Sequence, residues 1–237
     1  MAVTRRPSGG VAAATAALAL PLVRRTDPLL PWLIRLIGDL PLEPRQGRLA
    51  AEGGALGTLT QSLEPLDILL ERAPLRLSDT FIPGYFKHAA VFLGETAATP
   101  ADNPVLEARR EGVRLSPLPS PHQLDALVVL RDETLSQERR TSLLSEAEGE
   151  VGKSYDFLFD GSDRQRQFCS KLVAQLFRHL PLRGPARGRS LVVPDDFARL
   201  ALADSAPIRV TMLFLAGTAV PARFRRRRLG ELLGESV

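Results

Sequence analysis

Two stretches of the chain carry most of its structural information: Tyr85-Phe-Lys-His-Ala-Ala-Val-Phe-Leu-Gly94 and Phe168-Cys-Ser-Lys-Leu-Val-Ala-Gln-Leu-Phe-Arg-His-Leu180. The first contains an unbroken apolar run at 89–93, closed by a glycine, and this pattern predicts a buried strand that is entered through His88. The second repeats apolar residues at helical spacing, so it predicts a helix with one buried face and with Cys169 at its start. A histidine and a thiol are therefore both expected on rigid elements.

Similar patterns on either side extend this picture to a sheet. Short apolar runs at 66–70, 105–108, 113–115, 126–130 and 208–215 predict further strands, several of them separated by turn-forming residues such as Gly112. A polar segment at 136–151 predicts a surface helix capped by Ser136, and 194–202 predicts a helix opened by Pro194. Because strands joined by short turns pair antiparallel, we expect an α+β fold in which a central antiparallel sheet packs against helices.

The composition excludes several classes of protein. The 237 residues are 44% hydrophobic and 24% charged, as in soluble globular chains, and they leave room for one core with an N-terminal extension. The net charge of +4 comes largely from arginines spread along the chain, and aromatic residues are only 5%, which argues against a nucleic-acid-binding face. The single cysteine rules out an intramolecular disulfide and a metal cluster of thiolates.

The two ends of the chain differ from the middle. An apolar run at 11–23 lies between arginine pairs, as in a signal peptide, but Pro21 interrupts it and no small-residue cleavage site follows. The run is too short to cross a bilayer as a helix, so we expect a cytoplasmic or peripheral membrane location rather than export. The segment 31–40 has the spacing of a short amphipathic helix that either packs on the domain or lies on a membrane surface. The arginine run at 225–228 predicts a solvated, flexible basic tail.

Cys169 is the candidate nucleophile. A thiol attacks as the thiolate, and its ordinary pKa leaves only a minor fraction ionised at neutral pH. The positive end of the helix dipole and a nearby imidazole would both favour the thiolate. Among the three histidines His88 is the best candidate base, because His122 lies in a predicted loop and His179 near the end of a predicted helix.

A third polar group normally orients the base by accepting its other ring proton. Glu107 is the best candidate, since it lies within an apolar strand and its carboxylate would need a partner if it were buried. Glu95 is the runner-up, although its place after Gly94 favours a solvated turn. Tyr85 and Tyr155 are candidates for contacting substrate or hydrogen-bonding the oxyanion, with aromatic packing as the alternative.

Five segments together resemble the YiiX/YebB-like cysteine hydrolases, a circularly permuted, papain-like branch of the NlpC superfamily. They are 66–69, 85–94, 106–108 with 112–113, 152–157 and 168–173, and the segment 191–197 is similar to a helix opening near the family's C-terminal end. The order is diagnostic, because histidine precedes cysteine here, the reverse of ordinary papain-like chains. The resemblance covers residues 58–220. It implies Cys169 as nucleophile, His88 as base and Glu107 as the third member.

The resemblance also implies an activity. It points to a hydrolase that cleaves an amide or ester bond through a thioester, in a peptide, a cell-wall peptide or a lipid-linked acyl group. Two alternatives stay open: an acyltransferase of the lecithin:retinol type, and a catalytically silent, membrane-associated binding module. The chain departs from the family pattern at Lys171, where an acidic residue is common, and at Lys87, where a serine is common. A lysine near the thiol is expected to favour the thiolate, although on the first helical turn it opposes the dipole.

Asp156, Asp160 and Asp163 cluster just before the cysteine. Their spacing lacks the glycine and the terminal glutamate of a calcium loop, so we interpret them as loop-capping residues. We expect no metal and no cofactor, and a peptide or acyl-lipid substrate as the partner. The predicted organisation is an N-terminal extension (1–58), a hydrolase domain (59–220) and the basic tail (221–237).

Overall fold

The computed structural model describes residues 38, 40–51, 55–96, 98–102, 104–182 and 191–235. Its centre is a seven-stranded sheet with the order β4-β3-β2-β1-β5-β8-β9, in which all paired strands run antiparallel. The strands are β1 (Asp67–Arg72), β2 (His88–Phe92), β3 (Val105–Arg109), β4 (Gly112–Ser116), β5 (Ala126–Asp132), β8 (Ile208–Leu215) and β9 (Thr218–Ala219). Two short strands, β6 (Ser154–Tyr155) and β7 (Arg166–Gln167), pair in parallel next to β4.

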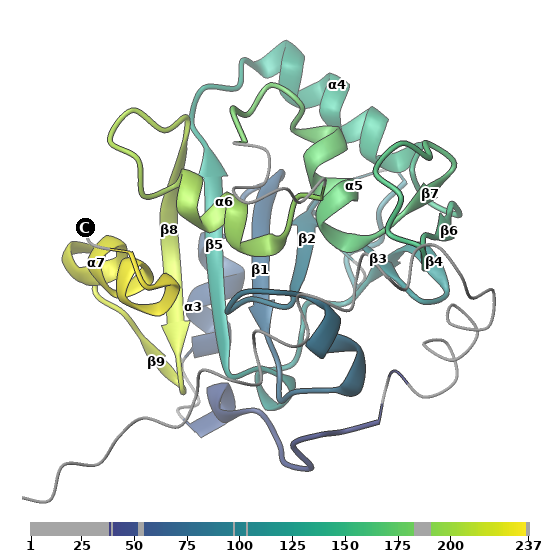
Figure 1. Cartoon of the computed structure of the whole chain (residues 1–237). Coiled ribbons are helices and arrows are strands. Elements are labelled where there is room, and N and C mark those ends of the chain that lie inside the picture. Colours follow the sequence, from purple (N-terminus) through teal and green to yellow (C-terminus); the bar gives the residue numbers. More distant parts are fainter. Residues whose placement is uncertain are drawn as a thin grey trace, which may run out of the picture.

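Helices cover both faces of the sheet (Figure 1). The helices α4 (Gln137–Glu148), α5 (Cys169–Leu176), α6 (Pro194–Leu200) and α7 (Ala222–Leu233) contribute to the core on one face. The helix α3 (Ala55–Ser62) and the 3-10 helix η1 (Arg48–Ala51) contribute to the core on the other. Two more 3-10 turns, η2 (Leu77–Phe81) and η3 (Pro121–Gln123), lie in connections.

Burial of the sheet on both faces explains why the strands are unbroken apolar runs in the sequence. In β1, Ile68 and Leu70 pack towards the core of α4 to α7, while Leu69 between them packs towards α3 and η1. Successive side chains of a strand point to opposite faces, so a sheet that is buried on both sides needs apolar residues at consecutive positions. Each fully buried leucine or isoleucine of this kind contributes about 1.5–3 kcal/mol.

The predicted α+β architecture is confirmed, and the two helices that open at Ser136 and Cys169 end earlier than predicted. The surface helix begins after Ser136, whose side chain accepts a hydrogen bond from the backbone N–H of Arg139, and it ends at Glu148 rather than at 151. The helix that starts at Cys169 ends at Leu176, because the backbone leaves helical geometry at Phe177. Phe177 and Leu180 remain buried in single turns beyond the helix, so their helical spacing reflected burial rather than helix length.

The prediction of a flexible basic tail is wrong for residues 222–233, which form α7. Leu229 is fully buried, and Arg225 donates hydrogen bonds to the backbone oxygens of Val220 and Thr211. Arg226 donates to the backbone oxygen of Leu202 at 2.6 Å. Arginine combines a long apolar stem with several donors, so an arginine-rich segment can dock on a sheet edge when backbone acceptors are in reach.

The predicted signal-like run at 11–23 lies outside the described residues, and so does almost all of the predicted helix at 31–40. Among the helices that the structure does describe, none is long and apolar enough to cross a bilayer. The domain boundaries at 58 and 220 stay predictions.

Candidate active site

Helix α5 presents Cys169 at its first position. Phe168 precedes it in an extended conformation, and the side chain of Phe168 makes no capping hydrogen bond to the first turn of the helix. The buried face of the helix, which includes Leu172, Val173 and Leu176, packs against the sheet at β2 and β3. Cys169 is 5% exposed, and its sulfur accepts hydrogen bonds from the backbone N–H groups of Ala89 and Ser170.

A buried carboxylate fixes the entry of β2, where His88 lies. Asp195, from the start of α6, accepts hydrogen bonds from the backbone N–H groups of Tyr85 at 2.8 Å and Phe86 at 2.9 Å. Gly84 has a φ of +105°, and a Cβ there would lie 2.3 Å from an Asp195 carboxylate oxygen. Only glycine fits both the backbone angle and the close approach. Asp195 therefore sets the path of the chain into His88.

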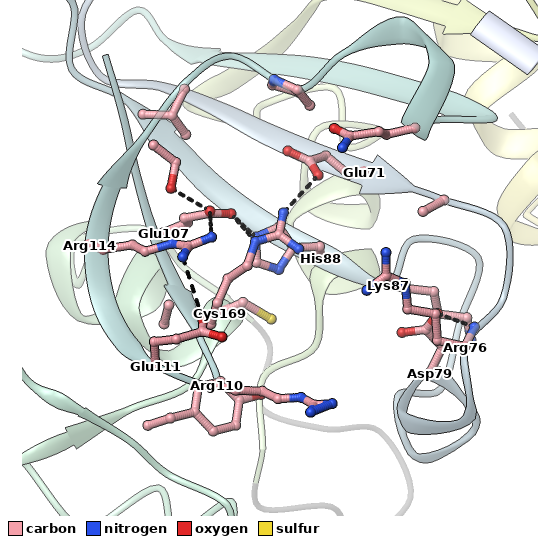
Figure 2. Close-up of a pocket in the computed structure, with 18 of the residues that line it drawn as sticks. Glu71, Arg76, Asp79, Lys87, His88, Glu107, Arg110, Glu111, Arg114 and Cys169 are labelled. Atoms are coloured by element: carbon pink, nitrogen blue, oxygen red, sulfur yellow. Dashed lines mark hydrogen bonds and ion pairs between the residues drawn. The ribbon is translucent and has the colours of Figure 1, made fainter. Parts of the chain in front are cut away.

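His88 and Glu107 form the predicted pair. The Nε2 atom of His88 lies 2.9 Å from Oε2 of Glu107, which is 4% exposed on β3 (Figure 2). Figure 2 shows the sulfur of Cys169 beside the imidazole ring, and the interaction of the thiol with the ring raises the pKa of His88. Because Nε2 faces the carboxylate, Nδ1 is the ring nitrogen left for the thiol. The structure thus brings Cys169, His88 and Glu107 together.

The carboxylate of Glu107 has further partners that hold it in place. Ser116 donates to Oε1 at 2.6 Å, and Nε of Arg109 donates to Oε2 at 2.6 Å. Arg114, opposite Glu107 in the β3–β4 hairpin, lies 3.5 Å away. A buried carboxylate with several charge-assisted hydrogen bonds stays ionised and keeps its orientation.

These contacts overcome the cost of burying charge. Burial opposes ionisation of Cys169, but the hydrogen bond and the charge of His88 hold the pKa of the thiol below its ordinary value. Burial and the charge of Arg109 oppose protonation of His88, whereas its bonds to Cys169 and Glu107 raise its pKa to about 10. Burial likewise opposes ionisation of Glu107, and the His88 imidazolium holds that pKa well below its ordinary value. These contacts therefore favour the thiolate of Cys169 and the imidazolium of His88.

The triad opens into a cavity of about 710 Å³. Tyr155 lines this cavity together with Phe157 and Phe159, whereas Tyr85 is not among the lining residues. Tyr85 instead packs edge-on against Phe86 and carries the Arg72 guanidinium over its ring. Of the two predicted substrate-contacting tyrosines, the structure therefore brings only Tyr155 to the site.

The other candidate residues lie elsewhere. Glu95 is an exposed turn residue, as its position after Gly94 suggested. His122 is exposed in η3, and His179 pairs with the buried carboxylate of Asp132 at 2.6 Å. Asp156, Asp160 and Asp163 each accept a hydrogen bond from a backbone N–H two residues later, which confirms their interpretation as loop-capping residues. In the described part of the chain, no group of three or more His, Cys, Asp or Glu residues is placed to hold a metal ion.

Comparison with known proteins agrees with this geometry. Residues 62–189, more than half of the chain, match the family described as permuted papain-like amidase enzymes, YaeF/YiiX, C92 family. The chain belongs to this family. A crystal structure of the metalloprotein yiiX from Escherichia coli O157:H7 is also similar, at 24% sequence identity, with 67% of this chain and 96% of that chain covered and a TM-score of 0.42. Among curated proteins none matches the chain.

Membership of the permuted papain-like amidases establishes the class of enzyme. The chain is a hydrolase of the cysteine type with a papain-like fold in permuted order, as the five segments predicted. The family does not by itself assign roles to individual residues or name the bond that is cleaved.

Sequence reasoning missed four polar residues of this amidase site: Ser116, Arg109 and Arg114 around Glu107, and Glu71 opposite His88 on β1. A signal for Arg114 was available. Gly112 closes the β3–β4 hairpin, and counting back along both strands from it pairs Glu107 with Arg114. Glu71 gave no signal, because its pairing with His88 depends on a register that joins segments 17 residues apart.

Proposed function

We propose that Cys169 is the nucleophile, His88 the general base and acid, and Glu107 the group that orients His88, in an enzyme that hydrolyses an amide or ester bond through a thioester. The observation that carries the proposal is that His88, bonded to Glu107, lies beside the Cys169 sulfur at the wall of the cavity. A thiolate beside an imidazolium is the reactive form of a cysteine nucleophile.

In the acylation step, the Cys169 thiolate attacks the carbonyl carbon of the substrate and the carbonyl oxygen becomes an oxyanion. The tetrahedral intermediate then collapses: the bond between carbon and the leaving nitrogen or oxygen breaks, and the His88 imidazolium gives its proton to the leaving group. The products of this half-reaction are a thioester on Cys169, a free amine or alcohol, and a neutral His88. Glu107 keeps the ring aligned throughout, because its carboxylate accepts a hydrogen bond from Nε2 while the proton stays on the ring.

In the deacylation step, neutral His88 takes a proton from water, and the hydroxide attacks the thioester carbon. Collapse releases the carboxylic acid and restores the Cys169 thiolate beside the His88 imidazolium. In both steps the oxyanion develops next to the start of α5. The backbone N–H of Cys169 and the hydroxyl of Tyr155 are the groups we assign to it, because the helix start is free of a capping side chain and Tyr155 lines the cavity.

The lining of the cavity favours a substrate with an apolar acyl part. One side carries aliphatic residues that continue the core beneath α3 and η1, namely Val105, Leu118 and Leu124. Burying one methylene on such a surface contributes about 0.8 kcal/mol. An acyl chain or an apolar peptide side chain next to the scissile carbonyl would therefore gain affinity with length. Much of the remaining lining is charged, including Arg110, Glu111 and Arg114, and suits a polar leaving group.

Alkylation of the single cysteine tests the proposal without a known substrate. We would measure the rate of Cys169 modification by iodoacetamide against pH, by intact mass, for the wild type, His88→Ala and Glu111→Gln. The last variant alters an exposed carboxylate at the cavity rim and serves as the control. The wild type and the control should react fast well below the pH at which a free thiol ionises, near 8.5.

His88→Ala should react slowly until the pH approaches that value. Rates that are slow and identical in the wild type and His88→Ala would overturn the pairing. Acyl esters and anilides of increasing chain length should then give a thioester adduct on Cys169, detected as a mass increase equal to the acyl group, and no adduct on Cys169→Ser under the same conditions.

A further inference from the structure

Lys171 is a buried lysine that follows the nucleophile by two residues. It is 8% exposed, and its ammonium lies 3.2 Å from Oδ2 of Asp156, a carboxylate that is itself 1% exposed. The same ammonium donates to the backbone oxygen of Asp160 at 2.6 Å and to the backbone oxygen of Asp163. An ammonium has three N–H donors. All three are therefore used on the loop that joins β6 to β7, and the expectation that Lys171 serves the thiol directly does not fit this geometry.

The loop that Lys171 holds forms the aromatic wall of the cavity, which we define as Tyr155, Phe157 and Phe159. The ring of Tyr155 lies 4.9 Å from that of Phe157 and 6.4 Å from that of Phe159. Phe159 in turn lies 5.3 Å from Phe168, whose ring faces the Lys171 ammonium at 5.6 Å. The lysine is thus linked to the wall both through the loop backbone and through a chain of rings.

The loop's other described hydrogen bonds act mainly within the loop itself. Its regular hydrogen bonds are short-range turns, in which aspartate side chains cap backbone N–H groups two residues on. Its outer residues Gly161, Ser162 and Arg164 are exposed. Short-range turns fix local bends but not the position of a loop on the protein surface. The oxygen atoms that converge from Asp156, Asp160 and Asp163 resemble a cradle for a cation, and the chain fills it with its own ammonium.

We propose that Lys171 is a positioning residue that fixes the aromatic wall against α5, and that the wall determines which acyl groups the enzyme accepts. The second half of this inference rests on the proposed function, since it assumes an acyl substrate in the cavity. The first half does not, because the position of the loop can be measured in the absence of any substrate.

The experiment compares the wild type with Lys171→Ala, in the presence and absence of propylammonium chloride. Propylammonium matches the atoms that the substitution removes, and tetramethylammonium chloride, which has no N–H donor, serves as the salt control. Lys153→Ala is the matched control variant, since Lys153 precedes the loop and pairs with Glu150 outside it. Three quantities are measured: hydrogen exchange of the segment 157–166 by mass spectrometry, the pH profile of Cys169 alkylation, and KM for acyl substrates of increasing length.

Lys171→Ala should raise hydrogen exchange in the segment about tenfold or more, which is the effect expected from losing at least one charge-assisted hydrogen bond. Propylammonium should reverse the change and tetramethylammonium should not. KM should rise for long acyl groups and stay unchanged for acetyl, while the midpoint of the alkylation profile stays at its wild-type value. If Lys171→Ala fails to fold, Asp156→Asn removes the same ion pair while an amide oxygen still caps Leu158, and it should also raise exchange.

Unchanged hydrogen exchange in both variants would overturn the proposal. A shifted midpoint of the alkylation profile, with hydrogen exchange of the loop unchanged, would also overturn it, because Lys171 would then act on the thiol. Increased exchange with KM unchanged for every acyl length would refute the assignment of selectivity to the wall. Failure of the proposed function looks different: no acyl substrate is turned over and alkylation shows no dependence on His88, whatever the loop does.

Discussion

Replacing Glu107 by glutamine should narrow the pH range in which the ion pair of Cys169 and His88 exists. The amide keeps the shape of the side chain and an oxygen that accepts from Nε2, but it removes the negative charge next to the imidazolium. His88 has a pKa of about 10, against an ordinary value of 6.5. This rise in pKa corresponds to a free energy of about 5 kcal/mol.

Cys169, Glu107 and Glu71 are among the groups that favour the imidazolium. Loss of the Glu107 charge should therefore remove part of this stabilisation, about 1 to 3 kcal/mol. The pKa of His88 should then fall, and the pKa of Cys169 should rise because its cationic partner is weaker. The thiolate then forms at a higher pH and the imidazolium is lost at a lower pH, so the pH range of the ion pair becomes narrower. The same energy predicts a loss in kcat/KM of about tenfold to a hundredfold.

The assay is the rate of Cys169 alkylation from acidic to alkaline pH, followed by intact mass. The wild type should show fast alkylation that begins at acidic pH, and Glu107→Gln should begin to react at a higher pH. Glu111→Gln again serves as the control, because Glu111 is exposed and its pairing is with Arg114 rather than His88. A Glu107→Gln profile that superimposes on the wild type would refute the electrostatic reasoning, even if hydrolysis were lost.

Three further predictions concern the structures that support the pair. Asp195→Ala should lower the free energy of unfolding in urea by about 3 kcal/mol or more, since it leaves two backbone N–H groups at the entry of β2 without their charged acceptor; a loss below about 1 kcal/mol would show that other contacts fix that entry. Lys171→Met and Asp156→Asn should each lower the free energy of unfolding by about 3–5 kcal/mol, because each single change leaves a buried charge unpaired. The double variant should lose clearly less than the sum of the two, and simple additivity in the urea denaturation of all four proteins would contradict this. The difference in unfolding free energy between the wild type and His88→Ala should be largest below pH 6.5 and fall to a pH-independent remainder as the pH rises through about 10, because the folded protein binds the His88 proton more tightly than the unfolded chain does. A difference that grows with pH in parallel denaturation series would refute the raised pKa.

The residues that sequence reasoning placed correctly are those whose burial leaves a local pattern. His88 adjoins an unbroken apolar run and Cys169 opens a helix with one apolar face, so each could be located from its own neighbours. Glu107 was recognisable because a carboxylate inside an apolar strand needs a partner. All three lie where regular secondary structure, and not a loop, determines the position of the side chain.

The residues that sequence reasoning missed or misread depend on contacts between distant segments. Asp195 lies in the first turn of α6, and its bonds to the backbone at 85–86, more than 100 residues away, were missed. The arginine run at 225–228 has the composition of a solvated tail, and only the backbone acceptors at Thr211 and Leu202 make it a docked helix. Lys171 was expected near the thiol because it is close in sequence, although the loop oxygens take its ammonium. Charge and spacing along the chain do not identify such partners.

The reversed order of histidine and cysteine becomes understandable from the packing of α5. The catalytic geometry depends on two facts: His88 begins β2, and α5 packs against β2 so that Cys169 meets the backbone at Ala89. Neither fact depends on the order in which the two elements occur in the sequence. Chain order decides only the connections, and here the strands β3, β4, β5, β6 and β7 and the helix α4 lie between His88 and Cys169 in the sequence. Since Glu107 lies in that intervening segment and reaches His88 across β2 and β3, the third member is brought to the site by sheet register alone. A change that shifts the β2–β3 register by one residue would therefore point Glu107 to the opposite face and leave Cys169 and His88 in place without it.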